Sequence, residues 1–187
     1  MQQLLKASNY RKMPWKNKKG VTSEIYIHPQ ESNLENLNFE FRLSSAPIIE
    51  DTVFSKFSGF ERILIPIRGS GFMLNGHIYE KFEAAHFAGD ADTHCDLIEG
   101  EVLDLGLIYD PQFMQAQVKL INFEKSLKIT TSKDSIFLVY ILTGSARIGD
   151  QEGQTNDCWV VSQSESIHFE SSKKAMLAFF TLNPKTN

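Results

Sequence analysis

The stretch RILIPIRGSG, residues 62–71, indicates the fold class of this chain. Isoleucine recurs at every second position, at Ile63, Ile65 and Ile67, and glycines follow at Gly69 and Gly71. A two-residue period is typical of a β-strand, and glycine after such a run indicates a tight turn. We therefore expect a strand that ends in a turn, the building unit of β-sandwiches and barrels.

A similar run, FLVYILTGSA at residues 137–146, repeats this arrangement of an apolar strand that leads into glycine. Further alternating or apolar runs occupy residues 24–28, 158–161 and 175–180, and no convincing helical period interrupts them. The fold class is therefore predicted to be all-β. The repeat favours two β lobes, residues 1–110 and 111–187, packed as one unit with their boundary near the Pro111 turn.

Composition limits the classes of partner. With 42% hydrophobic residues and 14 phenylalanines in 187 residues, the chain has ample apolar surface for a folded core. The net charge of −4 and the pI near 5.7 argue against a general nucleic-acid binder. Basic residues are dense only in residues 11–19. A solvent-exposed turn is a simpler interpretation of this run than a basic arm that binds nucleic acid.

The cellular compartment is predicted from what the sequence lacks. The first residues have no apolar core of signal-peptide length, and no run approaches the ~18 apolar residues that span a bilayer. Cys95 and Cys158 are the two cysteines, too few for a disulfide framework or a zinc site. We expect a cytoplasmic protein with reduced thiols and no membrane partner.

Polar side chains alternate with apolar ones in two of the predicted strands. In residues 39–44, aromatic residues and leucine alternate with positions that include Arg42 and Ser44, and in residues 103–107 leucines flank Asp104. In an open sheet such a polar face meets water. In a barrel it lines the lumen, where arginine, acidic and serine side chains form a pocket for one small ligand.

Five stretches now identify a resemblance: MPWKNKKGVTSEI (13–25), FEFRLSSA (39–46), VFSKFSGFERILIPIRG (53–69), HFAGD (86–90) and CDLIEGEVLDLGLIY (95–109). In this order they resemble the motifs of the HutD/Ves family. The resemblance implies a bicupin, with two small jelly-roll β-barrel lobes in one chain. It also implies a bacterial cytoplasmic protein linked to histidine utilisation or stress response, without established catalysis.

The resemblance also implies a ligand site. Its predicted residues are Trp15, Asn17, Thr22, Glu24, Arg42, Ser44, Ser55, Arg62 and Asp104. Phe54 and Asp90 also stand at family positions. The turn at residues 13–20 is expected to bring Trp15 and Asn17 to the rim of a barrel and to deliver Thr22 and Glu24 into it. The sequence departs from the family pattern at Lys18–Lys19 and at Gly106 and Ile108, which changes the expected mouth and lining of the pocket.

Metal and nucleophilic chemistry receive no support from the residues. The five histidines include no His-x-His pair, so we expect a metal-free site and no cofactor. Ser44 and Ser55 occur in no Gly-x-Ser-x-Gly elbow. Glu24 and Asp104 either act as acid and base or form a buried network with Arg42 and Arg62 that orients the arginines for a carboxylate; the network is favoured.

The predicted function is the binding of a small carboxylate, such as formylglutamate or urocanate, in a regulatory or sequestering role. Arg42 and Arg62 are the expected anion-recognising residues, because a guanidinium matches a carboxylate through two hydrogen bonds. The alternatives are a cupin isomerase or lyase that uses Glu24 or Asp104 as general base, and an interaction protein with an empty barrel. The expected partner is a small anionic metabolite, not nucleic acid, with a homodimer left open.

Overall fold

The computed structural model describes residues 1–15 and 20–185 and divides into two compact units. One unit is Arg11–Phe113, and the other combines Met1–Tyr10 with Met114–Asn187. Helical structure in the described residues is limited to the 3-10 turn η1 (Ala7–Asn9). The all-β prediction is therefore confirmed, whereas the packing of the lobes as one unit stays a prediction.

The first ten residues do not lie in the lobe to which the sequence assigned them. Strand β1 (Gln2–Leu5) pairs antiparallel with β17 (Cys158–Ser162), so the chain begins in the second unit. Asp157 holds the following residues, because its carboxylate accepts hydrogen bonds from Ala7 N at 2.8 Å and from Lys6 Nζ at 3.0 Å. The chain passes from one unit to the other between Phe113 and Met114.

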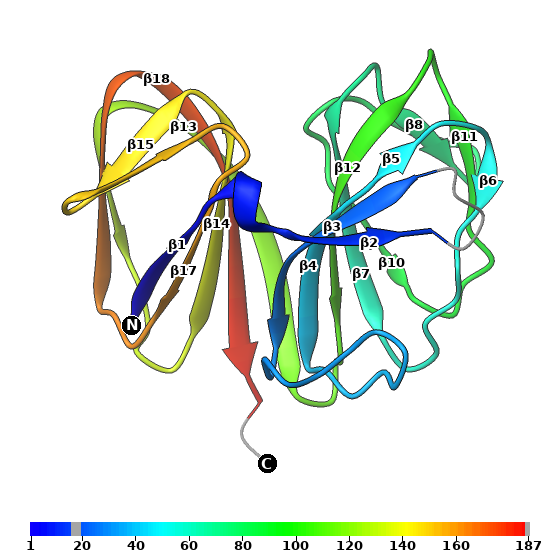
Figure 1. The fold of residues 1–187 in the computed structure, drawn as a ribbon, viewed down its shortest axis with the longest axis horizontal. Helices are drawn as coiled ribbons and strands as arrows, with labels where there is room; N and C mark the ends of the chain where they lie inside the picture. Colours follow the sequence, from blue (N-terminus) through cyan, green and yellow to red (C-terminus); the bar gives the residue numbers. More distant parts are fainter. Residues whose placement is uncertain (16–19, 186–187) are drawn as a thin grey trace. The chain divides into compact units, whose positions relative to one another are not determined.

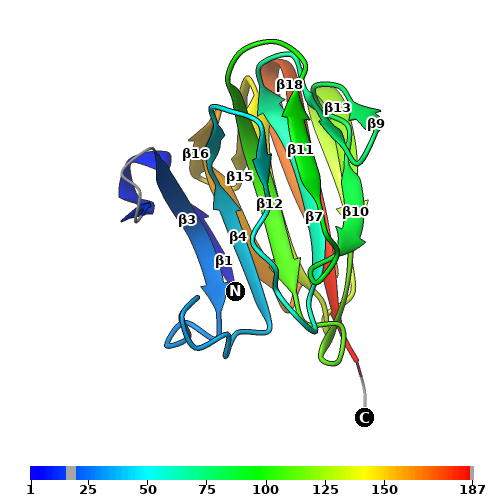
Figure 2. The same ribbon diagram turned by 90° about the vertical axis from the view of Figure 1, so that its right-hand side faces the viewer.

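The unit Arg11–Phe113 consists of two antiparallel sheets. The larger sheet has the strand order β10-β7-β12-β4-β3-β2, with the short strand β5 also paired to β12. Figure 2 shows β3, β4, β12, β7 and β10 side by side in this order. Its strands are β2 (Arg11–Pro14), β3 (Val21–His28), β4 (Phe41–Ser45), β5 (Pro47–Ile48), β7 (Glu61–Arg68), β10 (Ala85–Ala88) and β12 (Val102–Tyr109). The smaller sheet, ordered β6-β11-β8-β9, contains β6 (Thr52–Val53), β8 (Phe72–Leu74), β9 (His77–Tyr79) and β11 (His94–Leu97).

The second unit is built on one seven-stranded antiparallel sheet, which Figure 1 shows together with the first unit. Its strand order is β1-β17-β14-β18-β15-β16, and β13 pairs with β18 along the whole of β13. The strands not yet given are β13 (Met114–Thr130), β14 (Ile136–Thr143), β15 (Ser145–Ile148), β16 (Gln151–Gln154) and β18 (Ser166–Pro184). The long strands β13 and β18 bend at a register shift between Phe123 and Lys125.

The two glycine turns of the sequence repeat share the same backbone conformation and the same close contact. Gly69 follows β7 and Gly144 follows β14, with φ angles of +94° and +80°. A Cβ atom would lie 2.5 Å from the Glu101 carbonyl oxygen at Gly69 and 2.8 Å from the Lys174 carbonyl oxygen at Gly144. Both positions therefore need glycine, for its conformation and for the close approach of a second backbone.

Each unit has a buried apolar cluster, and each also buries charged side chains. In the second unit, aromatic and aliphatic side chains such as Trp159, Phe169 and Phe179 form one buried cluster. In the unit Arg11–Phe113, a buried apolar cluster that includes Phe72 and Cys95 occupies part of the interior. Buried charged side chains accompany it at Glu24, Arg42 and Asp104. No helix in residues 1–15 and 20–185 is long and apolar enough to cross a membrane.

Candidate functional site

One face of the larger sheet carries the predicted polar residues. In the strand register, Arg62 on β7 lies opposite Ile108 on β12, which lies opposite Arg42 on β4. The next row along contains Ser44 opposite Glu24 on β3. Side chains two residues apart on a strand point to the same face, so these residues and Asp104 share it. Figure 2 shows the strands that carry them side by side.

Arg42 and Glu24 form a buried ion pair on this face. Arg42 Nε donates a hydrogen bond to Glu24 Oε2 at 2.7 Å, and the two side chains are 4% and 6% exposed. Arg42 Nη1 donates to Ser44 Oγ at 3.1 Å, and Nη2 lies 3.5 Å from Met13 Sδ. Arg11 Nη1 reaches the second oxygen of Glu24 at 3.5 Å. Each guanidinium nitrogen of Arg42 therefore has a partner within the protein, and its charge is neutralised by Glu24.

Trp15 and Thr22 extend this half of the site towards the β2–β3 turn. The Trp15 indole Nε1 donates a hydrogen bond to Thr22 Oγ1 at 2.8 Å. Thr22 lies opposite Met13, which contacts Arg42. The structure thus connects Trp15, Thr22, Glu24, Arg42 and Ser44, whereas Asn17 lies outside the described residues.

Arg62 lies in a different environment from Arg42. Its guanidinium carbon is 4.9 to 5.5 Å from the centroids of three aromatic rings, those of Phe54, Phe57 and Phe87. Such rings stabilise a cation through their negative faces without neutralising its charge. Within the described part of the chain, no carboxylate lies within ion-pair distance of Arg62. Among the described residues, Arg62 is therefore a cation without an acidic partner at ion-pair distance, and burial lowers its pKa.

Ser55 takes part through its backbone rather than its side chain. Arg62 Nη1 donates to the Ser55 carbonyl oxygen at 3.3 Å, while the Ser55 residue itself is exposed. The three phenylalanines around Arg62 were not among the predicted site residues. Phe54 and Phe57 lie in the quoted motif VFSKFSGF, and Phe87 lies directly opposite Arg62 in the pairing of β10 with β7.

Asp104 is the second incompletely paired charge on this face. Its Oδ1 accepts a hydrogen bond from Ala46 N at 2.9 Å, and its residue is 9% exposed. Burial raises the pKa of Asp104 to about 7, although the Ala46 N–H and the charges of Arg62 and Arg42 act in the opposite direction. No arginine or lysine among the described residues lies within 4.0 Å of its carboxylate. The structure thus forms the Glu24–Arg42 part of the expected network as a direct contact and leaves Asp104 at longer range.

Metal-ligand and thiol chemistry have no geometric basis in this part of the protein. Residues 1–15 and 20–185 contain no group of three or more histidine, cysteine or acidic side chains that could hold a metal ion. Burial raises the pKa of the Cys95 thiol to about 12, so this buried thiol stays protonated and unreactive at neutral pH.

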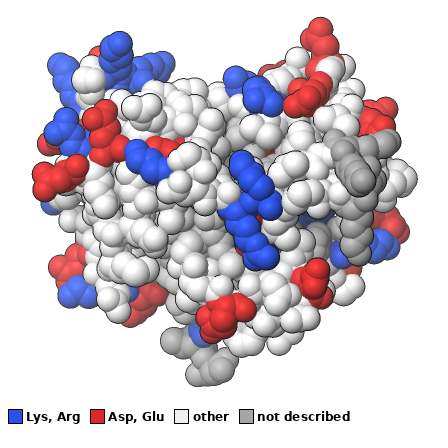
Figure 3. All heavy atoms as spheres, in the orientation of Figure 1, with Lys and Arg blue, Asp and Glu red and all other residues white. Residues whose placement is uncertain are grey.

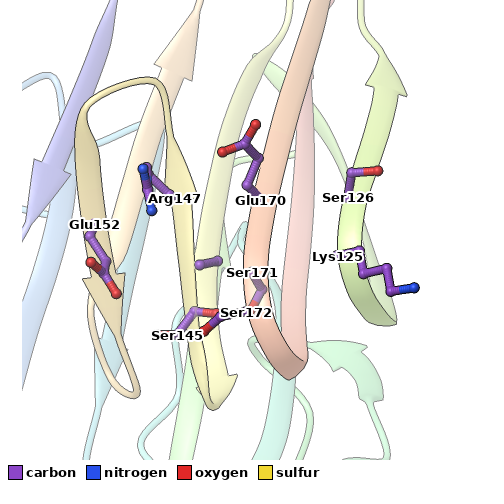
Figure 4. A pocket seen from close by; sticks show the side chains of 9 residues that line it. Lys125, Ser126, Ser145, Arg147, Glu152, Glu170, Ser171 and Ser172 are labelled. Carbon is purple, nitrogen blue, oxygen red and sulfur yellow. The ribbon is translucent and has the colours of Figure 1, made fainter.

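A pocket of about 340 Å³ is lined only by residues of the second unit, none of which belongs to the predicted site. Figure 4 shows Arg147 on β15 between Glu152 on β16 and Glu170 on β18, which the strand register also places opposite it. These charged residues are exposed, so water and salt screen any ligand contact that they make. Figure 3 shows acidic groups beside basic groups over much of one face of the molecule, with one short run of basic side chains near the centre of the view.

Comparison with known proteins gives matches over most of the chain. A family model described as HutD matches residues 7–179. A Pseudomonas putida protein described as an uncharacterized 21.2 kDa protein in the hutC 3′ region is 35% identical over 141 residues, which cover 73% of this chain and 72% of that protein. Protein Ves of Citrobacter koseri is 29% identical over 160 residues, which cover 80% of each chain.

Solved structures show the same fold. HutD from Pseudomonas fluorescens SBW25 is similar with a TM-score of 0.83 at 24% identity and covers 100% of both chains. A bacterial pirin from Escherichia coli, solved in complex with nickel(II), has a TM-score of 0.68 at 10% identity and covers 99% of this chain and 100% of its own. The expected bicupin architecture is therefore confirmed. The match to the HutD model across residues 7–179 also confirms the resemblance seen in residues 13–109, and the chain belongs to the HutD/Ves family.

Proposed function

We propose that this protein binds a small carboxylate at Arg62 and acts as a regulatory or sequestering protein rather than as a metal enzyme. The observation that carries the proposal is the environment of Arg62, a mostly buried guanidinium with three aromatic neighbours and no carboxylate partner among the described residues. A guanidinium in such a place gains most from a ligand that supplies the missing negative charge through two parallel hydrogen bonds.

The contrast with Arg42 supports the choice of Arg62. Arg42 already donates to Glu24, Ser44 and the sulfur of Met13, so an added carboxylate would have to displace existing partners. Breaking a buried ion pair leaves a charge without compensation and is costly. We therefore propose that Arg42 and Glu24 stabilise the structure of the site and that Arg62 binds the ligand. Of the two arginines expected from the sequence to bind the anion, only Arg62 keeps that role.

The class of ligand follows from the charge of the face and from the relatives. Glu24 and Arg42 form an ion pair, whereas Arg62 has no acidic partner within ion-pair distance among the described residues, so its positive charge is available to an anion. One relative is described by its place near hutC, which supports a carboxylate of histidine degradation, such as formylglutamate or urocanate. We propose that the protein acts in the cytoplasm on a small anionic metabolite, without nucleic-acid or membrane partners. A homodimer remains a prediction.

A second candidate function rests on Asp104. A carboxyl group whose pKa lies near 7 is suited to transfer a proton at neutral pH, so Asp104 is the candidate general base of an isomerase or lyase. Glu24 is not suited to that role, because both of its oxygens face arginines. Incubation of the protein with each bound carboxylate, followed by proton NMR of the ligand, distinguishes binding from turnover. Unchanged ligand spectra favour the binding protein, and new resonances favour the enzyme.

The proposed function is tested with matched acids and amides. Formylglutamate, urocanate and glutamate are added to the purified protein, and each is compared with an analogue in which the carboxylates are replaced by amides. Since a ligand that binds the native state raises the melting temperature with concentration, at least one acid is expected to raise it and its amide analogue to leave it unchanged. Equal shifts with acid and amide, or no shift with any acid at millimolar concentration, would contradict carboxylate recognition.

A further inference from the structure

One carboxyl oxygen of Asp104 accepts no hydrogen bond from the described residues. Its Oδ1 accepts the Ala46 N–H, its backbone oxygen accepts the Ser45 hydroxyl at 2.6 Å, and its backbone N–H donates to the Ala46 carbonyl. These bonds fix the residue at the junction of β4, β5 and β12. Its second carboxyl oxygen, Oδ2, accepts no hydrogen bond from residues 1–15 and 20–185, and it is not one of their fully buried polar atoms without a partner, so it is accessible to a ligand.

The charged and titratable groups that face Asp104 come from three neighbouring strands. Arg62 on β7 and Arg42 on β4 act on its carboxylate at a distance, and the Cys95 thiol faces it from β11. The short strand β5 contributes only Pro47 and Ile48, which carry no charge. The Arg42 charge is already neutralised by Glu24, so Arg62 is the main positive charge that favours ionised Asp104.

We propose that Asp104 is the second recognition group of the Arg62 site, and that a carboxylate ligand binds there together with one proton, which Asp104 carries. The neutral carboxyl group donates a hydrogen bond from Oδ2 to an oxygen of the ligand. This inference rests on the proposed function, because it requires a carboxylate at Arg62.

Asp104 takes up a proton because the ligand carboxylate and the Asp104 carboxylate compete for the positive charge of Arg62. When a ligand carboxylate pairs with Arg62, the field that favours ionised Asp104 is cancelled, and a second negative charge enters the same poorly solvated face. Burial already raises the pKa of Asp104 to about 7, and both effects of the ligand raise the pKa further. Protonation removes the repulsion and turns Oδ2 from an acceptor into a donor that matches the ligand.

The same geometry selects among carboxylates. A zwitterionic amino acid would have to place its ammonium beside Asp104, where apolar residues such as Val102, Ile48 and Cys95 form a buried cluster. Moving a charged ammonium group from water into such surroundings costs more hydration free energy than moving a neutral polar group there. The preferred ligand is therefore an acid without a cationic amino group, for example an N-acylated amino acid rather than a free one.

The experiment measures proton uptake in the wild-type protein. Formylglutamate is titrated calorimetrically at pH 8 in phosphate and in Tris, whose ionisation enthalpies differ, so that the difference in heat gives the number of protons bound per ligand. The expected uptake is about one proton per ligand at pH 8 and close to zero at pH 5.5, where Asp104 is protonated beforehand. The dissociation constant is expected to rise about tenfold per pH unit above pH 7. Glutamate, the zwitterionic comparison, is expected to bind more weakly than formylglutamate at pH 8.

Variants separate this inference from the proposed function. Asp104→Asn is expected to abolish proton uptake and to make the dissociation constant independent of pH between 6 and 8.5, whereas Asp150→Asn, at an exposed turn of the second unit, is expected to retain both effects. Binding that requires Arg62 but takes up no proton at pH 8 would overturn the role of Asp104 alone. If formylglutamate does not bind, or if Arg62→Lys leaves its affinity unchanged, the proposed function fails and this inference fails with it.

Discussion

Arg42 Nε lies 2.7 Å from Glu24 Oε2, and the two side chains form an ion pair that is almost entirely buried. This contact distinguishes Arg42 from Arg62, although the sequence predicts the same role for both. Arg42 is committed to an acid of its own chain, whereas Arg62 is surrounded by phenylalanine rings and has no acidic partner among the described residues. Because their partners differ, we expect substitutions of Arg42 to change the stability of the protein and substitutions of Arg62 to change its affinity for the ligand.

Removal of Arg42 is expected to destabilise the protein strongly. Arg42→Ala leaves Glu24 buried without its main partner, which costs on the order of 3–5 kcal/mol in the free energy of unfolding. Arg11→Ala is the matched control, because Arg11 contacts the same carboxylate but its side chain is 66% exposed; its cost is expected to stay below about 1 kcal/mol. Urea unfolding of both variants measures the difference, and equal losses would show that the buried contact has no special weight.

The stability of the wild-type protein is expected to fall as pH rises because of Asp104. Its pKa is raised from 3.8 to about 7 in the folded state, so between these values the folded protein binds a proton that the unfolded chain has lost. The free energy of unfolding then decreases as pH rises through this window, and the whole penalty is present above pH 7. Relative to Asp104→Asn, the wild type is expected to lose on the order of 1–4 kcal/mol between pH 4.5 and pH 8.

The measurement for Asp104 is urea unfolding of wild type and variant at several pH values. Asp150→Asn serves as the control, since Asp150 is exposed and the same substitution there is expected to leave the pH dependence unchanged. Parallel pH profiles for the wild type and Asp104→Asn would show that Asp104 is ionised at all these pH values and would remove its pH-dependent role.

The attachment of the first ten residues to the second unit is expected to depend on Asp157. This buried carboxylate accepts bonds from Ala7 N, Lys6 Nζ and Gln154 N at 2.8 to 3.0 Å. Asp157→Ala leaves two backbone N–H groups without their acceptor and is expected to cost on the order of 2–4 kcal/mol in the free energy of unfolding. Lys6→Ala removes only a partner that is 44% exposed and is expected to cost less than about 1 kcal/mol. If Asp157→Ala were as stable as Lys6→Ala, the backbone contacts would have no role in holding this segment.

Local pattern was sufficient to predict the strands and the polar face. The period of two residues in stretches such as 62–68 and 103–107 is a property of neighbouring positions, and it correctly placed Arg42, Ser44 and Asp104 on one side of their strands. The glycines that end β7 and β14 were equally visible, because their need for a positive φ angle is local.

Contacts between segments that are distant in the sequence could not be predicted from the local pattern of apolar and polar residues. The pairing of β1 with β17 joins residues 2–5 to residues 158–161, and no feature of either stretch specifies the other. The different roles of Arg42 and Arg62 depend on cross-strand neighbours, such as Phe87 opposite Arg62, that are fixed only by the register of the folded sheet. Ser55 was predicted as a ligand-site residue, and the hydrogen bond between its carbonyl oxygen and Arg62 depends on the folded loop before β7.

The most direct measurement of the central claim is the affinity of formylglutamate for the wild type, Arg62→Lys and Arg68→Lys at pH 6.5. Arg68 lies on the same strand and pairs with Glu101 at the surface, so its substitution controls for the loss of a guanidinium on β7. Arg62→Lys is expected to weaken binding by about 10- to 100-fold, because lysine provides a point charge in place of the planar fork, while its melting temperature without ligand stays close to that of the wild type. Arg68→Lys is expected to bind as the wild type does. Equal affinities for the wild type and Arg62→Lys would contradict the assignment of Arg62 as the carboxylate-binding residue.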